Sequence, residues 1–240
     1  MPTKPSKYYI TQKIEEMAKE KPSMSILDLG SGKSLNFEKI LKNFPQLSYT
    51  GIEPKKSDYE MAREKFKSRD NAVFINSLAY ENNPLLKDQY DLVVSFSVLE
   101  HVKYLDKFLN FAAQKTKLGG TCIHLYDLGH ALYPSSLKER LHVWLCSNSF
   151  TQKFIPETKF VCYLSSLVAE QKMKEMGLSI DRVTFHNSPD HVKLIKTVGE
   201  DYELIKQISE NEVVWSSKIK NRKQQEILFP AVCIWSRKIT

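Results

Sequence analysis

The stretch Ile26-Leu27-Asp28-Leu29-Gly30-Ser31-Gly32-Lys33-Ser34 decides the fold of this chain. Its first residues are apolar, as in a buried strand, and the two glycines after them predict a turn that leads into a helix. A ligand can approach the bare backbone of such a turn, and the N-terminus of a helix offers unpaired N–H groups. The carboxylate of Asp28 would repel a phosphate and attract an ammonium group, so the stretch favours a cationic ligand.

Two phosphate-binding patterns fit this stretch only in part. Gly32-Lys33-Ser34 matches the end of a P-loop, but Leu27 stands where that pattern requires its first glycine. Gly30 and Gly32 match the start of the dinucleotide pattern G-x-G-x-x-G, but Leu35 replaces its third glycine. A site for a ligand without phosphate is therefore the better interpretation.

Further strands are predicted after the glycine turn. The next one, residues 47–52, ends at Glu53-Pro54. An acidic residue about 20 positions after a glycine turn, at the tip of the next strand, can accept hydrogen bonds from both hydroxyls of a ribose. Residues 25–29 predict the first strand, residues 72–75, 90–95 and 121–126 predict three more, and residues 227–235 predict the last one. Gly119-Gly120 predicts the end of the helix before residue 121, a helix is expected near 202–208, and the sequence 82–84 predicts a turn. Strands that alternate with helices in this way predict a parallel α/β sheet with right-handed crossovers.

Four motifs carry a resemblance to a known family: "LDLGSG", "GIEP", "YDLVVSFSVLEHV" and "LGGT". In this order and spacing, residues 24–127 resemble the class I S-adenosylmethionine (SAM)-dependent methyltransferases, and "VLEHV" is most similar to the quinone-biosynthesis-like group of small-molecule methyltransferases. The resemblance implies SAM as cofactor. It also implies a Rossmann-like α/β fold, with a mostly parallel sheet, an antiparallel last strand, helices on both faces and cap insertions.

The resemblance also implies which residues bind the cofactor. The residues expected to hold the methionine part of SAM are Asp28, Gly30, Ser31 and Gly32. Glu53 is expected to accept the ribose hydroxyls, Pro54 or Ile52 to pack on the adenine, and Ser95 and Phe96 to lie along the cofactor. The run Asn76-Ser77-Leu78-Ala79 departs from the Gly-Asp-Ala element that contacts the adenine amine in many relatives. The adenine is then expected to be held by packing and backbone, or by Ser77 or Asn76.

Two histidines are candidates for a general base. Methyl transfer is an in-line displacement, and it needs a base only when the acceptor must lose a proton early. His101 follows the fourth strand and His130 follows the fifth, so both are catalytic candidates, with Tyr126 and Asp127 placed to orient the acceptor or a histidine. His124 falls within the fifth strand, where a structural role is expected.

Length and composition fit one globular domain over residues 1–240, with a cap insertion at 127–160 and a second insertion at 187–224. The four cysteines are dispersed without a C-x-x-C pair, so no metal site is predicted and a reducing, cytoplasmic setting is expected. No apolar run is long enough to span a membrane, and no signal peptide is visible. The sequence leaves the oligomeric state open.

Three functions remain in competition. The aromatic segment after the fifth strand favours a methyltransferase that acts on a small-molecule acceptor. The net charge of +7 permits an RNA or protein methyltransferase, although no N-P-P-Y or D-P-P-Y element follows the fourth strand, so nucleic acid is disfavoured as a partner. A noncatalytic SAM-binding partner protein is the third alternative, which Leu78 supports and the intact Asp28, Gly30, Gly32 and Glu53 oppose.

Overall fold

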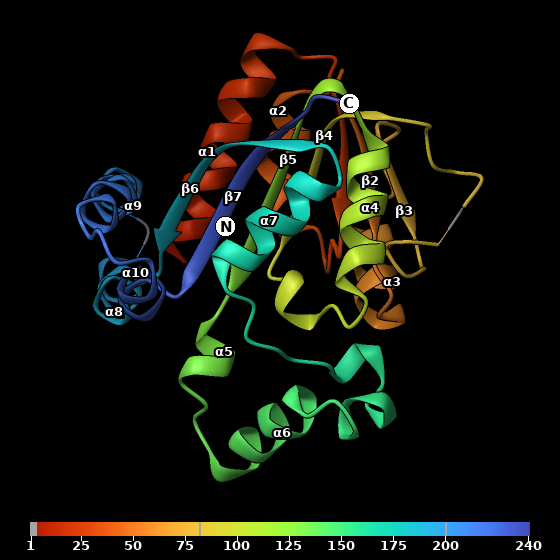
Figure 1. The fold of residues 1–240 in the computed structure, drawn as a ribbon. Coiled ribbons are helices and arrows are strands. Elements are labelled where there is room, and N and C mark those ends of the chain that lie inside the picture. Colours follow the sequence, from red (N-terminus) through yellow and green to blue (C-terminus); the bar gives the residue numbers. More distant parts are fainter. Residues whose placement is uncertain (1–3, 82, 200) are drawn as a thin grey trace.

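Seven strands form one sheet in the order β3-β2-β1-β4-β5-β7-β6 (Figure 1). The computed structural model describes residues 4–81, 83–199 and 201–240; Asn82, within the predicted turn at 82–84, lies outside these residues. β7 alone runs opposite to the other six strands, which confirms the predicted fold class. The strands are β1 (Ser25–Leu29), β2 (Ser48–Ile52), β3 (Ala72–Ile75), β4 (Tyr90–Phe96), β5 (Thr116–Asp127), β6 (Leu178–His186) and β7 (Ala231–Lys238).

Helices connect these strands and cover both faces of the sheet. The α-helices are α1 (Pro5–Glu20), α2 (Glu38–Asn43), α3 (Lys56–Lys65), α4 (Leu105–Lys115), α5 (Gly129–Leu132), α6 (Leu137–Ser147), α7 (Ser166–Glu175), α8 (Pro189–Val198), α9 (Tyr202–Ser217) and α10 (Arg222–Leu228). Short 3₁₀ helices are η1 (Leu35–Phe37), η2 (Leu99–His101), η3 (Thr151–Phe154) and η4 (Glu157–Lys159). Among the described residues, no helix combines the length and apolar character that crossing a bilayer requires.

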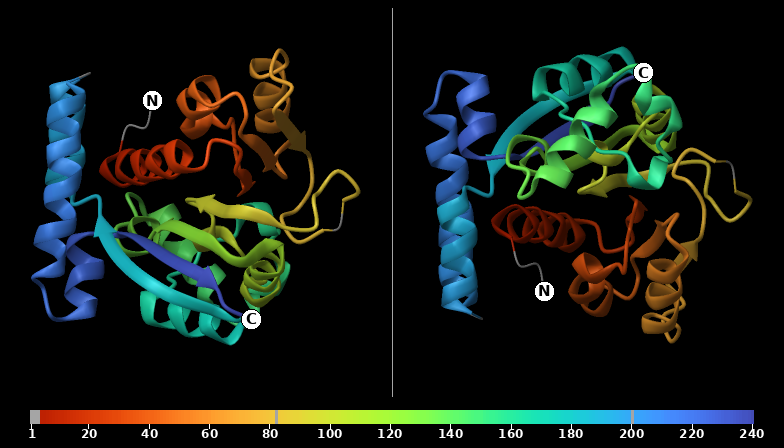
Figure 2. Two further views of the ribbon diagram at one scale, coloured as in Figure 1. Left: turned by 90° about the horizontal axis from the view of Figure 1, so that it is seen from above. Right: turned by 90° about the horizontal axis from the view of Figure 1, so that it is seen from below.

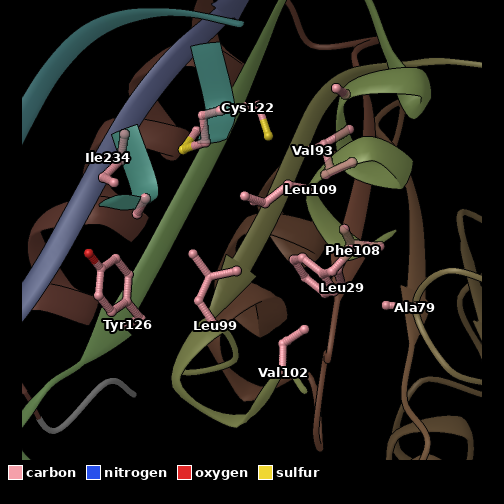
Figure 3. Packing of buried hydrophobic residues seen from close by; sticks show 14 of the residues in the cluster. Leu29, Ala79, Val93, Leu99, Val102, Phe108, Leu109, Cys122, Tyr126 and Ile234 are labelled. Atoms are coloured by element: carbon pink, nitrogen blue, oxygen red, sulfur yellow. The ribbon is translucent and has the colours of Figure 1, made fainter. Parts of the chain in front are cut away.

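Alternate residues of the central strands build two cores, one on each face of the sheet. Leu27 and Val93 point toward the face that α4 and α7 cover, where Phe108 and Leu109 of α4 complete the packing (Figure 3). Ile26, Leu92 and Val94 point to the opposite face, where α1 and α2 supply the facing side chains, among them Ile10, Ile14, Ile40 and Leu41. Strands that are apolar on both faces are typical of the centre of a parallel sheet.

The strand register brings the glycine turn beside the tip of β2. Leu29 of β1 pairs with Ile52 of β2, so Gly30 and Glu53 come next to each other at the carboxyl ends of the two strands. Ligands of open α/β sheets bind outside these ends. The segment that follows β5, with α5 and α6, also lies beyond this edge of the sheet (Figure 1).

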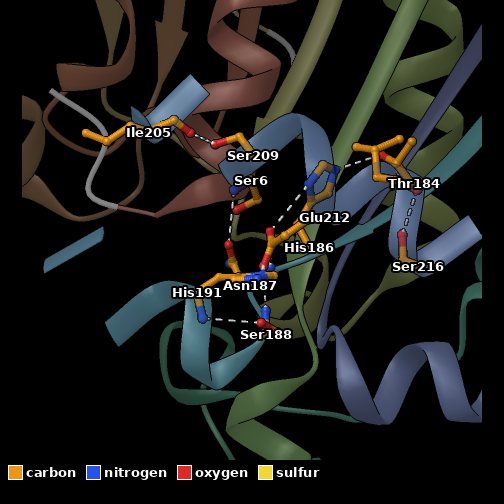
Figure 4. A network of polar contacts seen from close by, with 11 residues as sticks. Ser6, Thr184, His186, Asn187, Ser188, His191, Ile205, Ser209, Glu212 and Ser216 are labelled. Atoms are coloured by element: carbon orange, nitrogen blue, oxygen red, sulfur yellow. Dashed lines mark hydrogen bonds and ion pairs between the residues drawn. The ribbon is translucent and has the colours of Figure 1, made fainter. Parts of the chain in front are cut away.

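Helices α8, α9 and α10 lie beside α1 and β6 (Figure 2). A buried polar network connects α8 and α9 to the rest of the molecule (Figure 4). The Glu212 carboxylate accepts hydrogen bonds from the backbone N–H groups of Asn187 and Ser188, at 2.9 Å each, and from His191 Nδ1 at 2.8 Å. Asn187 Oδ1 in turn accepts from the backbone N–H of Ser6 at 3.0 Å, so the network reaches α1.

The structure corrects several predicted boundaries. Gly119-Gly120 is predicted to end a helix, but both glycines lie inside β5, which begins at Thr116 instead of residue 121. The helix expected near 202–208 is confirmed as the start of α9, and residues 187–224 also hold α8 and the start of α10. The last strand begins at Ala231 instead of residue 227, because the apolar pair Ile227-Leu228 belongs to α10.

Candidate active site

The glycine turn uses its own N–H groups within the protein. Gly30 and Ser31 both donate to the Ile52 carbonyl oxygen, at 2.8 and 2.9 Å, and Gly32 donates to Glu53 Oε2 at 2.8 Å. The turn leads into η1 before α2 begins at Glu38, so the predicted strand–turn–helix order holds. The free N–H donors expected there are nevertheless satisfied by the tip of β2. The turn therefore positions Glu53 by direct hydrogen bonding.

Two backbone hydrogen bonds hold the carboxylate of Glu53 in place at the tip of β2. Its Oε1 accepts from the backbone N–H of Lys55 at 2.8 Å, while Oε2 accepts from Gly32. Burial raises the pKa of Glu53, and the two backbone hydrogen bonds oppose that shift. A carboxylate can accept about four hydrogen bonds, so acceptor positions remain on both oxygens. Asn76 also holds this tip, because its amide donates to the carbonyl oxygens of Glu53 and Pro54.

Asp28 is a buried carboxylate with one unpaired oxygen. Its Oδ2 accepts a hydrogen bond from Tyr49 Oη at 2.8 Å, whereas Oδ1 has no hydrogen-bond partner among the described residues. Burial raises the pKa of Asp28 to about 7, although the Tyr49 hydrogen bond lowers it. A buried carboxylate without a full set of donors is unfavourable, so the position suits a cationic group.

A cavity of about 530 Å³ lies beside Glu53. Six parts of the chain form its wall: the glycine turn, the tip of β2, the segment after β3, the segment after β4, α4 and η4. The lining residues are Gly30, Glu53, Pro54, Lys55, Leu78, Ala79, Tyr80, Ser97, Val98, His101, Val102, Phe108, Glu157, Thr158 and Lys159. The volume falls within the range of about 300–1,000 Å³ that is typical of small-ligand pockets.

His101 is the one catalytic candidate that lines this cavity. Its Nδ1 lies 3.0 Å from the carbonyl oxygen of Phe160. A carbonyl only accepts, so Nδ1 carries the proton and Nε2 of the neutral ring is free to accept one. Burial lowers the pKa of His101, which favours this neutral form. The ring has the protonation state that a general base requires.

His130 is exposed and lies outside the cavity wall, with its ring 5.7 Å from the ring of His101. Ligating atoms of these two histidines and of Glu100 all lie within 4.8 Å of one another. Glu100 Oε1 accepts from the backbone N–H of Asp127 at 3.1 Å, Oε2 has no partner among the described residues, and burial raises the pKa of Glu100 to about 8. Such a set can hold a divalent cation, although the sequence predicted no metal site.

Six of the predicted cofactor residues are not among those that line the cavity: Asp28, Ser31, Gly32, Ser77, Ser95 and Phe96. Ser95 Oγ lies 2.8 Å from His124 Nδ1 under α4, and Phe96 packs edge-on against Phe37 in the opposite core. Ser77 Oγ donates to the carbonyl oxygen of Leu78 or to Glu81, so it is already engaged. Ser31 is also buried, and its Oγ has no partner among the described residues.

Two residues of this region were missed by sequence reasoning. Tyr49 bonds to Asp28 from the middle of β2, and the alternation of strand residues could have placed it on that face. Lys7 of α1 is largely buried, and its ammonium lies within electrostatic reach of Glu100, Asp28 and Asp127. Burial lowers the pKa of Lys7. No local pattern distinguishes Lys7 from its neighbouring lysines, because only the packing of α1 brings it here.

Comparisons with known proteins agree with this geometry. A family model described as a methyltransferase domain matches residues 5–183. No curated protein matches the sequence. Among solved structures, the cyclase SpnF superposes with a TM-score of 0.61 at 12% identity, covering 96% of this chain and 80% of that chain.

Two further structures resemble the fold. One is the O-methyltransferase from a trans-AT PKS multienzyme of Brevibacillus brevis, in complex with S-adenosyl-L-homocysteine, with a TM-score of 0.56, 14% identity, and coverage of 95% of this chain and 71% of that chain. The other is geranyl diphosphate C-methyltransferase from Streptomyces coelicolor A3(2), with a TM-score of 0.57, 9% identity, and coverage of 95% and 79%. At these identities the likeness concerns the fold alone.

Proposed function

This chain belongs to the class I SAM-dependent methyltransferases, and from that premise we propose that it methylates a small molecule by in-line displacement. The observation that carries the proposal is the cavity beside Glu53, which has a small-molecule volume and reaches from the glycine turn to His101. One of the matched structures is named for a small-molecule acceptor, as a geranyl diphosphate C-methyltransferase, which supports the same substrate class.

The residues around the glycine turn fit the cofactor. Glu53 would accept the ribose hydroxyls with its remaining lone pairs, and the unpaired Oδ1 of Asp28 would take the ammonium of the methionine part. Pro54 and Leu78 line the part of the cavity where the adenine would pack. At Gly30, which has no side chain, the backbone itself forms part of the cavity wall. When bound, SAM supplies a methyl group on a positively charged sulfur.

The acceptor would occupy the part of the cavity that His101 and η4 line. Residues 127–160 would act as a cap over it, because η4 belongs to that segment and α5 and α6 lie beyond the same edge of the sheet (Figure 1). His101 would accept the proton of an acidic acceptor at Nε2. His130 would act on the acceptor from the exposed side, and the half-buried Asp127 would orient the acceptor or a histidine. The four free cysteines support a reducing compartment, which we propose is the cytoplasm.

Calorimetric titration with SAM and its demethylated product tests the cofactor site. The wild-type protein should bind both, and Glu53→Ala should weaken SAM binding by at least about tenfold, because two ribose hydroxyls lose a charged acceptor. Glu60→Ala is the matched control, since this carboxylate pairs with Lys56 on α3 and neither residue lines the cavity. No SAM binding by the folded wild-type protein would contradict the function, and equal affinity in Glu53→Ala would contradict the assignment of Glu53.

Turnover tests the role of His101. A screen of metabolite acceptors with the purified protein identifies the substrate, and RNA in the same screen tests the competing class. With an acceptor that must lose a proton, His101→Gln should lower kcat by about 10²-fold or more while the Kd for SAM stays unchanged. His130→Ala should have the smaller effect, because His130 does not line the cavity. Full activity of His101→Gln would remove His101 from the mechanism.

A further inference from the structure

Helix α6 presents its apolar side to solvent. Leu137 is 82% exposed, and Leu141 and Trp144 are each 57% exposed. The spacing of these residues, i, i+4 and i+7, puts all three on one face of the helix. The opposite face holds α6 to the protein, because Cys146 is buried and His142 Nε2 lies 2.7 Å from the carbonyl oxygen of Lys159. The arrangement inverts that of an ordinary surface helix, whose apolar side faces the core.

Two phenylalanines extend this exposed apolar surface. Phe150 and Phe154 are 68% and 76% exposed, and their rings meet edge to face with centroids 5.7 Å apart. They belong to η3 and the residue before it, and η3 packs against α6. Single exposed apolar residues are common, but five large ones within 18 consecutive residues mark an interaction surface.

Basic side chains flank the apolar stripe of α6. At about 3.6 residues per turn, Lys138 lies to one side of the stripe and Arg140 to the other. The one acidic residue of the helix, Glu139, is seven positions before the buried Cys146 and so shares its face. Its Oε2 is also engaged by the backbone N–H and Oγ of Ser135. The exposed side of α6 therefore carries apolar and cationic groups and no acidic one.

We propose that α6 is an interfacial helix that docks the protein on an anionic lipid bilayer. Leu137, Leu141 and Trp144 would enter the boundary between headgroups and acyl chains, while Lys138 and Arg140 extend to lipid phosphates. Tryptophan suits this depth because one end of its ring is apolar and the other is a hydrogen-bond donor. The net charge of +7 favours approach of the whole protein to such a surface.

A second copy of the chain fits this surface less well. In a symmetric dimer the same face meets itself, so Lys138 and Arg140 of both copies would gather around one contact with no acidic partner on the exposed side of α6. Docking on a bilayer also has a geometric consequence. Lys159, which lines the cavity, contacts the side of α6 that faces the protein, so docking would place α6 between the bilayer and this part of the cavity wall.

Co-sedimentation with lipid vesicles tests the proposal without any turnover. The protein should sediment with vesicles that contain phosphatidylglycerol and remain in solution with pure phosphatidylcholine. Its tryptophan fluorescence should shift to shorter wavelength on binding, and by less in Trp144→Phe, because the chain has two other tryptophans. Leu141→Glu should weaken partitioning by about tenfold or more, and Lys138→Glu by about tenfold or less. The matched control is Leu118→Glu, since Leu118 is 73% exposed near the opposite edge of the sheet, early in β5.

Several outcomes would overturn the proposal. One is a wild-type protein that does not sediment with the anionic vesicles, and another is an equal loss in Leu118→Glu and Leu141→Glu. A concentration-dependent dimer that Leu141→Glu dissociates, with no vesicle binding, would assign the surface to a second copy. Circular dichroism and SAM titration of Leu141→Glu exclude a folding defect, because Leu141 does not line the cavity. Failure of docking would leave SAM binding intact, so it can be distinguished from failure of the proposed function.

Discussion

Asp28 shows how one side chain can link burial to ligand choice. Its Oδ1 is buried without a partner among the described residues, and burial raises its pKa to about 7. Near neutral pH the unliganded protein therefore holds Asp28 in both the protonated and the ionised form. An ammonium group stabilises the ionised form, so binding of the proposed cofactor lowers the pKa of Asp28 and releases a proton.

SAM affinity should consequently depend on pH. Because the ionised form binds the ammonium, affinity should rise as the pH is raised through about 7, and at lower pH it should weaken by up to about tenfold per pH unit. Calorimetry from about pH 6 to pH 8, in buffers of different ionisation enthalpy, measures both the affinity and the released proton. Asp28→Asn cannot ionise and should lose the dependence. A wild-type affinity that is constant across this interval would refute the role of Asp28.

At the scale of elements, the turn between β1 and η1 shows why two glycines stand there. Both have positive φ angles, +76° at Gly30 and +54° at Gly32, but their surroundings differ. A Cβ at Gly30 would lie 2.5 Å from Val98 Cγ2, whereas a Cβ at Gly32 would meet nothing within 4 Å. Gly30 thus allows the turn to pack against the segment after β4, which a larger residue would prevent. Gly32 is required for its backbone angle.

Alanine substitutions should separate these two effects. Gly32→Ala should lower the free energy of unfolding by about 1 kcal/mol, through backbone strain alone. Gly30→Ala should lower it by about 3 kcal/mol, because the contact with Val98 is added to the strain. Urea denaturation measures both, and the double variant Gly30→Ala with Val98→Ala should regain part of the difference. If both single variants lose the same stability, the contact with Val98 has no energetic effect.

The elements differ in how well the sequence predicts them. The bounds of β1 and β3 match the prediction, because a short apolar run between polar turns can only be a buried strand of that length. The predicted start of β5 was wrong because Gly119-Gly120 resembles a helix end, while pairing with β4 instead extends the strand to Thr116.

The site residues also differ in how well the sequence predicts them. The glycine turn, Glu53 and His101 come together at the cavity, since strand ends gather at one edge of a parallel sheet. Ser95 and Phe96 point into the two cores. The pleat of the strand decides which face each side chain takes, and the order of the motifs in the sequence does not reveal it.

At the scale of the whole molecule, the network around Glu212 joins parts that are far apart in sequence. It links α1 through Ser6, the end of β6, the start of α8, and α9 (Figure 4). Glu212 is fully buried, and its carboxylate accepts hydrogen bonds from two backbone N–H groups that would otherwise lack an acceptor. Glu212 thus helps to fix the positions of α8 and α9 relative to α1.

Removing this carboxylate should weaken the whole fold. Glu212→Ala should lower the free energy of unfolding by about 3 kcal/mol, since two buried N–H groups lose their acceptor, and Glu212→Gln by about half of that. Hydrogen exchange should also become faster at the amide of Ser6. The matched control is Glu210→Ala on the exposed side of the same helix, which should change stability by less than about 0.5 kcal/mol. Equal effects of the two alanine variants would show that the network adds no stability.

The place of β7 in the sheet has a consequence for synthesis of the chain. β7 is made after β6 but lies between β5 and β6, pairing Leu125 with Cys233 on one side and Phe185 with Val232 on the other. Until the ribosome has released residues 231–238, the nascent chain holds β5 with an unpaired edge and β6 with no strand to join. Exposed strand edges recruit other chains. Ribosome-bound intermediates of this protein are therefore expected to depend on chaperones until the final strand inserts.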